Sequence, residues 1–397
     1  MIKRTVVDIE VEGKRVLLRA DLNVPLNRKT GTITDDTRIR AVLPTIIYLI
    51  DNKARVILCS HLGRPGGRVV EELRLTPVAQ CLSELLGQRV ITTDDCIGPE
   101  VDKAVSRLKD REVLLLENLR FHPEEEENDP SFAQALAGLA DLYVNDAFGT
   151  THRAHASTVG IAAYLPAVAG FLIEKELKIM GEALNSSTHP FALLIGGAKV
   201  SDKLGVLENI LKNVDSLLIG GGMAATFLKA RGYQVGLSLV EDDKLNTAQR
   251  LMGEMERRGV RLFLPVDVVI AERLDAQAAR ETVPVGDIPQ GWSIADIGPA
   301  TTGAFSEELK RCSTIVWNGP MGLYEIPRFA DGTRAMARLL ASLDATTVIG
   351  GGSTAEVVVE MGLVDEMTHV STGGGASLRF LEGKVLPGIA VLQDKGG

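Results

Sequence analysis

The sequence has few cysteines, no excess of positive charge and no long apolar run. Its four cysteines, Cys59, Cys81, Cys96 and Cys312, lack the spacing of a metal-binding motif. Cys59 lies within an apolar run, which predicts a small core residue. The net charge of −9 argues against a general binder of nucleic acids or membrane surfaces. If the ligand is an anion, the cationic groups that bind it must therefore be concentrated locally.

The sequence also shows no sign of a targeting or membrane-spanning segment. The longest nearly apolar stretch, residues 161–173, is too short to span a bilayer and contains Pro166. The first residues lead directly into VVDIEVEGKRV, which does not resemble a signal peptide. We therefore expect a reduced, cytoplasmic enzyme or binding protein.

Several catalytic motifs are absent as well. No G-x-x-x-x-G-K-[ST] sequence is present, which excludes a Walker-type NTPase, and no G-x-S-x-G nucleophile elbow occurs. His152 and His155 are three residues apart, but no third ligand follows at the spacing of a zinc helix. Two loose matches to the dinucleotide fingerprint begin at Gly220 and Gly350, and they keep a dehydrogenase open as an alternative.

The length and composition indicate a two-domain globular protein. At 397 residues the chain exceeds one ordinary core, and 45% hydrophobic with 24% charged residues is typical of globular proteins. Many of the 40 glycines lie at the ends of apolar runs. A helical pattern over residues 171–185 separates two halves of different character, and we expect it to be the connector.

In the first half, short apolar runs alternate with helical patterns, which is typical of βαβ units with a mainly parallel sheet. An acidic segment, residues 124–129, is expected to be a solvated surface. The expected strands lie within residues 16–23, 55–64, 112–120 and 142–148, and the expected helices start near Asp35, Thr76 and Ser131.

Polar side chains follow each of these apolar runs. Because ligands of open α/β sheets bind at the carboxyl ends of the strands, these side chains are expected to share one rim. Four arginines would suit an anion, since guanidinium groups bind phosphate or carboxylate bidentately. The rim comprises Asp21, Asn23, Arg38, His61, Arg64, Glu117, Asn118, Arg120, Asn145, Asp146 and Arg153.

The second half opens on a strand, turn and helix pattern, FALLIGGAKVSDK at residues 191–203. The apolar run ends at Gly196 and Gly197, and a helix is predicted directly after them. Lys199 and Lys203, four residues apart, would then share one helical face. Glycines at a helix start with two cations predict a phosphate site.

Triple glycines recur in this half after apolar runs. They lie in DSLLIGGGM (215–223), TTVIGGGST (346–354) and VSTGGGAS (370–377), and further strands are expected in residues 261–269 and 313–320. The backbone amides of these glycines would bind phosphates, and the glycine surface, which has no side chains, would accept a nucleotide base. One half is thus rich in arginine and histidine, the other in glycine and lysine. A reaction between an anionic substrate and a nucleotide would require the two halves to close on each other.

The sequence resembles the phosphoglycerate kinase family over nearly its whole length. The matching motifs, in order, are DLNVPL (21–26), SHLGRP (60–65), LENLRF (116–121), NDAFGTTHRAHAS (145–157), GGAKVSDK (196–203), LIGGGMA (218–224), LPVD (264–267), WNGPMGLYE (317–325) and STGGGAS (371–377). The resemblance implies reversible phosphoryl transfer from 1,3-bisphosphoglycerate to ADP in glycolysis, giving 3-phosphoglycerate and ATP, with Mg²⁺. It also implies in-line transfer after domain closure, with no phospho-enzyme.

The resemblance further implies two doubly wound α/β domains with a cleft between them. The phosphoglycerate-binding domain would comprise residues 1–170 and about 378–397, residues 171–185 the connecting helix, and residues 186–377 the nucleotide-binding domain. The segment from about Phe380 to Leu392 would return to pack on the first domain. We expect a monomer with small-molecule substrates and neither a nucleic acid nor a membrane partner.

The family's site residues carry over by position. Arg38 and Lys199 would neutralise the transferring group. The substrate would contact Asp21, Leu22, Asn23, Arg38, His61, Leu62, Gly63, Arg64, Arg120 and Arg153. The nucleotide would contact Lys199, Lys203, Gly220, Gly221, Gly222, Asn318, Glu325, Gly351, Gly352, Ser353 and Thr354. Ser371, Thr372, Gly373 and Gly374 would form a hinge or closure loop.

Two positions depart from the family pattern. Ser353 stands where the family usually has an aspartate that helps to hold the metal, so Mg²⁺ is expected to be held through the nucleotide phosphates, with the Ser353 hydroxyl as a candidate ligand. An N-cap role for Ser353 is the structural alternative. Arg379 replaces a glutamate, for which the sequence offers no reason. A dehydrogenase and a non-catalytic binder of nucleotide and acid remain the rival functions.

Overall fold

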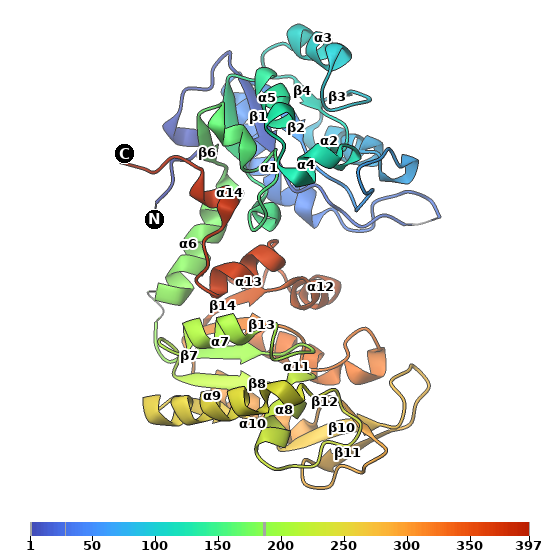
Figure 1. The fold of residues 1–397 in the computed structure, drawn as a ribbon, viewed down its shortest axis with the longest axis vertical. Coiled ribbons are helices and arrows are strands. Elements are labelled where there is room, and N and C mark those ends of the chain that lie inside the picture. The colour runs from blue at the N-terminus through green and yellow to red at the C-terminus, as the bar shows by residue number, and fades with distance from the viewer. Residues whose placement is uncertain (1, 28, 186–187, 397) are drawn as a thin grey trace. The chain divides into compact units, whose positions relative to one another are not determined.

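The computed structural model describes residues 2–27, 29–185 and 188–396, and it divides into two compact units (Figure 1). Unit 1 comprises Met1–Leu177 and Val385–Gly397, and unit 2 comprises Lys178–Lys384. Each unit is an α/β structure around its own parallel sheet, as the sequence predicts.

Unit 1 contains a six-stranded parallel sheet in the order β3-β4-β2-β1-β5-β6. Its strands are apolar along nearly their whole length, because helices cover a parallel sheet. The bounds are Arg15–Arg19 (β1), Arg55–Cys59 (β2), Val90–Thr92 (β3), Val113–Leu115 (β4), Leu142–Asn145 (β5) and Ala167–Ala169 (β6).

The helices of unit 1 cover the sheet with amphipathic faces. Ile39, Val42, Ile46 and Leu49 of α1 recur at helical spacing and pack in one core with alternate residues of β1 and β2. The bounds are Thr37–Asp51 (α1), Thr76–Leu86 (α2), Pro99–Arg107 (α3), Pro123–Glu127 (α4), Pro130–Gly138 (α5), Phe171–Asn185 (α6, shared with unit 2) and Pro387–Ala390 (α14); the short 3₁₀ turns are Val6–Asp8 (η1), Glu71–Leu73 (η2), Leu119–Phe121 (η3), Phe148–Thr150 (η4) and Gly160–Ala163 (η5).

The predicted strands and helices of unit 1 are confirmed, and the structure adds the strands β3 and β6 and the helices α3 and α4. Pro77 lies in the first turn of α2, where its missing N–H costs nothing. The sequence analysis did not predict β3 and β6, which have three residues each and so show too little periodicity.

Unit 2 contains a six-stranded parallel sheet in the order β15-β14-β13-β7-β8-β9 and a three-stranded antiparallel sheet in the order β11-β10-β12. The bounds are Phe191–Ile195 (β7), Ser216–Ile219 (β8), Arg261–Phe263 (β9), Asp267–Ala271 (β10), Arg280–Pro284 (β11), Ser293–Ile297 (β12), Thr314–Asn318 (β13), Thr346–Gly350 (β14) and His369–Val370 (β15).

The helices of unit 2 alternate with the strands of the parallel sheet, whereas β9 to β12 follow one another without a helix between them. Phe305, Met336 and Leu340 pack with Trp317 of β13 in the second core. The bounds are Leu204–Ile210 (α7), Met223–Ala230 (α8), Leu245–Arg258 (α9), Pro299–Leu309 (α10), Asp331–Ala341 (α11), Gly352–Glu360 (α12) and Gly375–Leu381 (α13), with 3₁₀ turns at Asp242–Lys244 (η6) and Pro327–Phe329 (η7).

The apolar run at residues 261–269 holds two strands that belong to different sheets. β9 pairs with β8 in the parallel sheet, whereas β10 pairs with β11 and β12. Pro265 lies between them and cannot donate to a ladder, so the chain leaves one sheet there and enters the other. The antiparallel sheet itself was not predicted.

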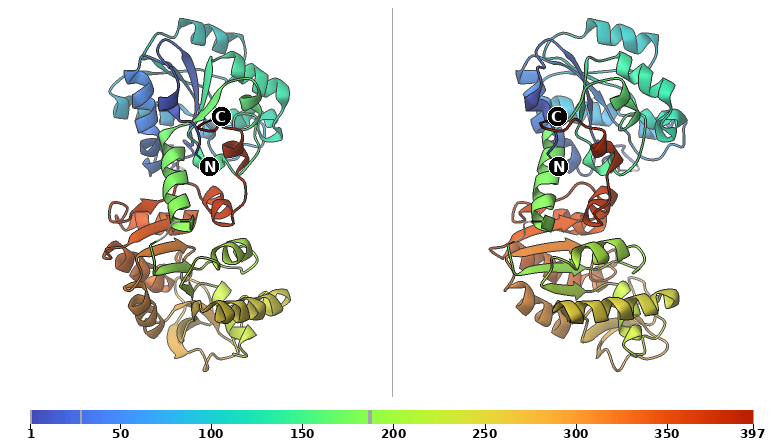
Figure 2. Two further views of the ribbon diagram at one scale, coloured as in Figure 1. Left: turned by 90° about the vertical axis from the view of Figure 1, so that its left-hand side faces the viewer. Right: turned by 60° about the vertical axis from the view of Figure 1, so that its left-hand side comes forward.

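α6 is one continuous helix over the residues predicted to form it (Figures 1 and 2). Its first turn is held in unit 1, where the buried Asp146 carboxylate accepts hydrogen bonds from the Leu172 and Ile173 amides at 2.9 and 3.2 Å. The Thr45 hydroxyl of α1 donates to the same carboxylate at 2.6 Å. Asp146 therefore ties α6 to the helix that carries Arg38.

No helix among the described residues is long and apolar enough to cross a membrane. The four cysteines form no disulfide. Cys59 is fully buried in the core, and its predicted place is confirmed.

Candidate active site

Seven of the predicted polar residues lie in the segments that follow the carboxyl ends of the unit 1 strands. We call this set the arginine site: Asp21, Asn23, Arg38, His61, Arg64, Arg120 and Arg153. Arg38 donates to Asp21 at 2.6 Å, and Asn23 accepts from the Gly63 amide at 2.8 Å. Arg120 donates to the Gly63 carbonyl at 2.9 Å. Gly63 has a φ of +65°, and a Cβ there would lie 2.7 Å from Leu73, so glycine is required at the centre of the site.

The members of the arginine site differ in burial. His61 and Arg120 are buried, whereas the side chains of Arg64 and Arg153 are exposed. The predicted contact residues Leu22 and Leu62 are buried as well, and their amides donate to Ser60 and Asn118 respectively. The buried side chains of Leu22 and Leu62 anchor the loops after β1 and β2 in the core of unit 1.

Glu117, Asn118, Asn145 and Asp146, also predicted for this rim, have structural partners instead. The carboxylate of Glu117 accepts from the Leu75 and Asn118 amides, and Asn118 donates to the Leu62 and Leu73 carbonyls. Asn145 donates to the Gly388 carbonyl at 3.2 Å. These side chains fix the loops and the C-terminal segment of unit 1.

Arg19, a fully buried arginine at the end of β1, was missed in the sequence analysis. Its Nε donates to the Ser157 hydroxyl at 2.9 Å, one Nη donates to the Ala20 carbonyl, and the other lies 3.2 Å from Nδ1 of His61. The signal in the sequence was a charge inside the apolar run VLLRA. A buried guanidinium needs hydrogen-bond acceptors, so an arginine within an apolar run indicates a buried charge with partners elsewhere in the fold.

The acidic segment at residues 124–129 was expected to be a solvated surface, and for Glu125 this is wrong. Glu125 is fully buried in α4 and accepts from the Ser157 hydroxyl at 2.6 Å and the Ser157 amide at 2.9 Å. Its carboxylate also lies 3.8 Å from Nδ1 of His155. The reason is tertiary: the buried charge of Arg19 requires a counter-charge, which Glu125 supplies through Ser157.

Burial and neighbouring cations lower the pKa of two histidines of this region, His61 and His155. Burial, followed by the charges of Arg19, Arg120 and Arg38, holds the pKa of His61 well below its usual value. Burial and the same kind of neighbours lower the pKa of His155 to about 4. Burial also lowers the pKa of Arg120, whereas the Glu126 carboxylate, 3.2 Å from Nε of Arg120, acts to raise it. Positive charge is therefore concentrated here, which suits an anionic ligand.

Unit 2 carries the second group, which we call the glycine site. Its cavity of about 390 Å³ is lined by Gly197, Ala198, Lys199, Asp202, Lys203, Asn318, Gly319, Pro320, Gly351, Gly352, Ser353, Thr354 and Leu378. Lys203 donates to Oδ1 of Asn318, and burial lowers the pKa of Lys203. Nδ2 of Asn318 is buried and has no partner among the described residues. A ligand with an acceptor, such as a phosphate oxygen, would satisfy this buried donor and would also suit the two lysines that line the cavity.

The helix expected directly after Gly197 does not form. α7 begins only at Leu204, so Lys199 and Lys203 lie in the loop before it and not on one helical face. The Gly196 and Gly197 amides donate to the Asn318 and Pro320 carbonyls at 3.0 Å each, which extends the chain along β13. These tertiary hydrogen bonds decide the backbone path, and the loop still places both lysines in the cavity.

Two glycines of this site permit close approach of backbone segments. A Cβ on Gly221 would lie 2.6 Å from the Gly197 amide nitrogen, and one on Gly319 would lie 2.3 Å from the Gly196 carbonyl oxygen. Both have positive φ, +65° and +97°. Gly220 plays a different part, because it packs against the Met321 side chain. Any side chain at Gly221 or Gly319 would therefore force the loops apart.

The start of α12 borders the cavity. Ser353 is not the N-cap of this helix, so the alternative structural role of Ser353 is wrong. The N-cap is Gly351, with a φ of +92°, so Ser353 lies inside the first turn. The Thr354 hydroxyl accepts from the Gly319 amide at 2.7 Å and joins α12 to the loop after β13. The Ser353 side chain lines the cavity together with Asp202, and both offer oxygen atoms.

A second, more apolar cavity of about 370 Å³ shares Gly197, Ala198 and Pro320 with the glycine site. Its remaining lining comprises Gly221, Gly222, Ala225, Leu237, Ser238, Leu239, Leu274, Ser293, Ile294, Ala295, Gly322, Leu323 and Glu325. Leu237 and Leu239, 66% and 56% exposed, offer an apolar surface that lacks a cover among the described residues. The sequence analysis placed Glu325 at the site but missed these leucines, because they lie in loops without periodicity.

The predicted hinge residues follow β15 within unit 2. The Ser371 hydroxyl lies 2.5 Å from the Ser377 hydroxyl and accepts from the Gly373 amide at 3.1 Å. Gly374, with a φ of +48°, is the N-cap of α13. This loop is thus ordered by local hydrogen bonds. Nothing in the structure explains the replacement at Arg379.

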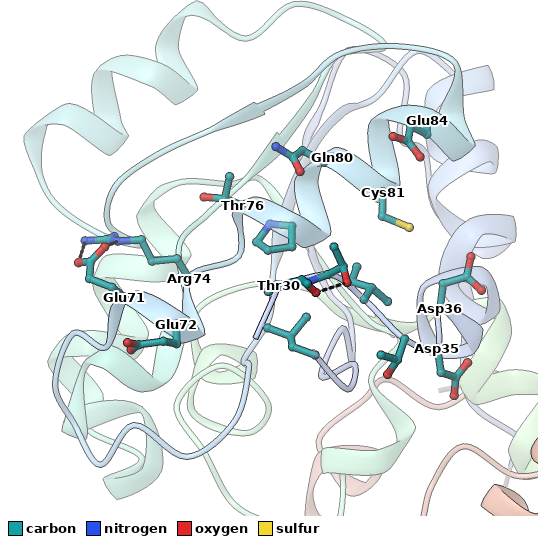
Figure 3. Close-up of a pocket in the computed structure, with 16 residues that line it drawn as sticks. Thr30, Asp35, Asp36, Glu71, Glu72, Arg74, Thr76, Gln80, Cys81 and Glu84 are labelled. Atoms are coloured by element: carbon teal, nitrogen blue, oxygen red, sulfur yellow. Dashed lines mark hydrogen bonds and ion pairs between the residues drawn. The ribbon is translucent and has the colours of Figure 1, made fainter. Parts of the chain in front are cut away.

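Another cavity, of about 810 Å³, lies elsewhere in unit 1 (Figure 3). Figure 3 shows the carboxylates of Asp35 and Asp36 on one side and those of Glu71 and Glu72 on the other. Arg74, the one cation among the lining residues that the structure describes, is already bound by Glu71 and Glu117 at 2.7 and 3.1 Å. The negative field of this cavity does not suit an anion.

One group among the described residues has metal-ligating side chains close together: Asp95, Cys96 and His122. Nε2 of His122 already lies 2.6 Å from the Asp95 carboxylate. A set with sulfur and nitrogen donors does not suit Mg²⁺, which prefers oxygen. The oxygen donors of Asp202 and Ser353 fit that ion better.

The chain matches one known protein family over most of its length. Residues 6–384 match the family model described as "Phosphoglycerate kinase". The curated phosphoglycerate kinases of Moorella thermoacetica and Pelotomaculum thermopropionicum are 56% and 58% identical over 395 residues, covering 100% of both chains.

Two solved structures have the same fold. Phosphoglycerate kinase from Coxiella burnetii superimposes with a TM-score of 0.86 at 41% identity, covering 98% of each chain. The enzyme from Pyrococcus horikoshii OT3 gives 0.85 at 35% identity, covering 99% of this chain and 98% of the other. These matches decide against the dehydrogenase and the non-catalytic binder. The chain belongs to the phosphoglycerate kinase family of glycolytic phosphotransferases, which transfer a phosphoryl group to or from a carboxyl group and use a magnesium nucleotide.

Proposed function

We propose that unit 1 binds the phosphoglycerate at the arginine site and that unit 2 binds the nucleotide at the glycine site and its apolar neighbour. The reaction is reversible phosphoryl transfer from 1,3-bisphosphoglycerate to ADP in glycolysis, the activity of the family. The observation that carries the assignment is the pair of cavities that share Gly197, Ala198 and Pro320. One has lysines and an unpaired amide, and the other has leucines, so together they fit a ligand with phosphates at one end and a base at the other.

Isothermal titration calorimetry tests this assignment with one variant from each unit. Lys203→Ala should weaken ADP binding and leave 3-phosphoglycerate binding unchanged, because only unit 2 loses a cation. Arg38→Ala should do the reverse. If either variant weakens the binding of the other ligand instead, the assignment of ligands to units is wrong.

The magnesium ion of the nucleotide would be held at the glycine site. Asp202 and Ser353 line the cavity and offer a carboxylate and a hydroxyl, which fit the preference of Mg²⁺ for oxygen. The ion supplies charge neutralisation to the nucleotide phosphates when bound. Since Mg²⁺ often uses only one or two carboxylates in addition to phosphate oxygens, the absence of an aspartate at position 353 is compatible with this site.

The reaction requires alignment and charge neutralisation from the protein, with little covalent chemistry. Arg38 and Lys199 would neutralise the transferring group, and the amides of the glycine loops would assist. The acyl phosphate would pass in line to the nucleotide, without a phospho-enzyme. Rapid quenching with labelled substrate checks this, because a phosphorylated protein would contradict direct transfer.

Transfer also requires the two ligands to meet, so we propose that the units close when both are bound. Residues 171–185 and the loop Ser371–Gly374 would absorb the change. Small-angle scattering should show a smaller radius of gyration with both ligands than with either one alone. An unchanged radius would count against closure.

We further propose that the protein acts as a monomer in the cytoplasm. Each site draws its residues from a single unit of one chain, so neither requires a second copy. Four cysteines without a disulfide fit a reducing compartment. Light scattering coupled to size exclusion would contradict the first part if it gave the mass of a dimer.

A further inference from the structure

The contact between Arg19 and His61 restricts the protonation of the imidazole ring. An Nη nitrogen of Arg19 lies 3.2 Å from Nδ1 of His61. A guanidinium has only donors and remains protonated in proteins, so it cannot accept from the ring. Nδ1 must therefore be the accepting, unprotonated nitrogen. In a neutral imidazole the single proton then resides on Nε2.

Arg19 is held firmly enough to impose this choice. The residue is fully buried, and its other two nitrogens donate to Ser157 and to the Ala20 carbonyl. Ser157 in turn donates to Glu125, whose carboxylate is also buried. The Ser157 hydroxyl thus accepts from the arginine and donates to the glutamate, which gives the chain of hydrogen bonds one direction. Rotating Arg19 away from His61 would leave buried donors without acceptors, which is costly.

We propose that Arg19 is a positioning residue that fixes His61 as the Nε2–H tautomer, so that His61 offers one hydrogen-bond donor to an oxygen of the phosphoglycerate. This inference rests on the proposed function of the arginine site. The hydrogen bond of the ring to the described residues is made by Nδ1 and not by Nε2, so the Nε2 proton is available to a ligand. Arg19 itself would touch no substrate atom and would act through His61.

The surroundings of His61 exclude the other protonation states. The cationic groups that face it are Arg19, Arg120 and Arg38, and His155 is the neighbouring titratable group. A second ring proton would place another positive charge among these guanidinium groups and opposite the Arg19 donor. His61 therefore remains neutral at physiological pH. It serves as a donor of fixed direction and not as a general acid or base.

Nitrogen-15 NMR of the histidine-labelled enzyme without ligands tests the tautomer directly. The chain has six histidines, so the ring signals can be assigned by single substitution. At pH 7 we expect the His61 ring to show a protonated Nε2 and an unprotonated Nδ1, with no change down to pH 6. A proton on Nδ1, or a doubly protonated ring at pH 7, would overturn the inference without any variant.

Steady-state kinetics tests the positioning role. Arg19→Gln should raise the KM for 3-phosphoglycerate by about tenfold, the effect of losing one well-aligned hydrogen bond, and should leave the KM for ATP unchanged. The matched control is Arg15→Gln on the same strand, because Arg15 is partly exposed and bound to Asp141 at 2.7 Å. Should Arg19→Gln fail to fold, Ser157→Ala removes the acceptor that holds Arg19 and should raise the same KM. Equal KM values for 3-phosphoglycerate in wild type and Ser157→Ala would contradict the inference.

Two substitutions of His61 test whether a hydrogen-bond donor at the position of Nε2, and not the imidazole ring itself, is what the substrate needs. Glutamine carries an amide donor at roughly the reach of Nε2, whereas asparagine reaches only as far as Nδ1. His61→Gln should therefore keep more of the affinity for 3-phosphoglycerate than His61→Asn, and the reverse order would overturn the donor role. Failure of the proposed function can be told apart from failure of this inference. If NMR shows the inferred tautomer but the Arg38→Ala variant binds 3-phosphoglycerate as tightly as the wild type, only the proposed function is wrong.

Discussion

The arginine site of unit 1 and the glycine site of unit 2 are built to attract anions by different physical means, under the proposed assignment. In unit 1 long side chains supply the charge, and they are held by other side chains, as Arg38 is by Asp21. In unit 2 the loops themselves form the cavity, with glycines at the points of closest approach and lysines at the edge. Side chains can be aimed individually at a small, rigid acid, whereas a surface of backbone amides accommodates phosphates of different number. The difference would match a compact acid in unit 1 and a nucleotide with a longer chain of phosphates in unit 2.

The largest effect is expected from removing a cation of unit 1. Arg38→Ala should lower kcat by about 10³-fold, because a guanidinium that neutralises a transferring phosphoryl group contributes on that scale. The control is Arg40→Ala, since Arg40 lies two residues along α1, is 59% exposed and pairs with Asp36. Steady-state assays in the direction of ATP formation measure both. A near wild-type kcat for Arg38→Ala would remove Arg38 from the mechanism.

In unit 2 the corresponding test disturbs the backbone. Gly221→Ala should weaken ADP binding by tenfold or more, on the order of the 1–3 kcal/mol that overpacking costs, because the new Cβ would lie 2.6 Å from the Gly197 amide. Gly259→Ala is the control, since it has a similar φ of +72° but no atom within 4 Å of the Cβ. Calorimetry with ADP should show a loss for the first variant only. Similar losses in both would mean that backbone strain, and not the contact, sets the affinity.

The two units share one feature, a buried carboxyl group. Burial raises the pKa of Asp146 in unit 1 and of Asp296 in unit 2 to about 7, against 3.8 for the ordinary group. Between pH 4 and 7 the unfolded chain loses these protons and the folded chain keeps them. The unfolded state then binds fewer protons, so stability falls as pH rises through this window.

Asp146→Asn should reduce this pH dependence, because asparagine remains neutral. The full shift corresponds to at most about 4 kcal/mol per group, and relaxation in the native state will make the measured change smaller. Urea denaturation at pH 4.5 and pH 7 measures the slope, and Asp296→Asn provides the matched change in the other unit. An unaltered slope in Asp146→Asn would show that this carboxyl group is ionised in the folded protein.

The smallest effect is expected at Ser353. A carboxylate here would add a charged oxygen ligand beside the nucleotide phosphates, so Ser353→Asp should lower the Mg²⁺ concentration for half-maximal rate by about two- to fivefold, the scale of a partly exposed charge interaction. Asp202→Asn should raise it. Titration of Mg²⁺ at fixed nucleotide measures both. An unchanged magnesium dependence in Ser353→Asp would mean that position 353 does not govern metal binding.

The sequence predicted most of the fold because its signals are local. Apolar runs that end in glycine or polar residues gave the main strands, and the periodicity of residues 171–185 gave α6. The short strands β3 and β6 carry too few residues for such a signal. The predicted helix after Gly197 failed for another reason, because hydrogen bonds from Gly196 and Gly197 to the loop after β13 override the local pattern.

The residue types of both sites were likewise evident in the sequence, whereas their supports were not. The arginines, lysines and glycines lie at the carboxyl ends of strands, a place that βαβ topology dictates from the order of elements alone. By contrast, the link from Glu125 through Ser157 to Arg19 joins residues up to 138 positions apart in the chain, and the apolar cavity draws on loops remote in sequence. Local pattern thus determined which elements form and which chemistry they carry. Only the tertiary structure decided which charges are buried and paired, because burial depends on every segment that packs around a residue.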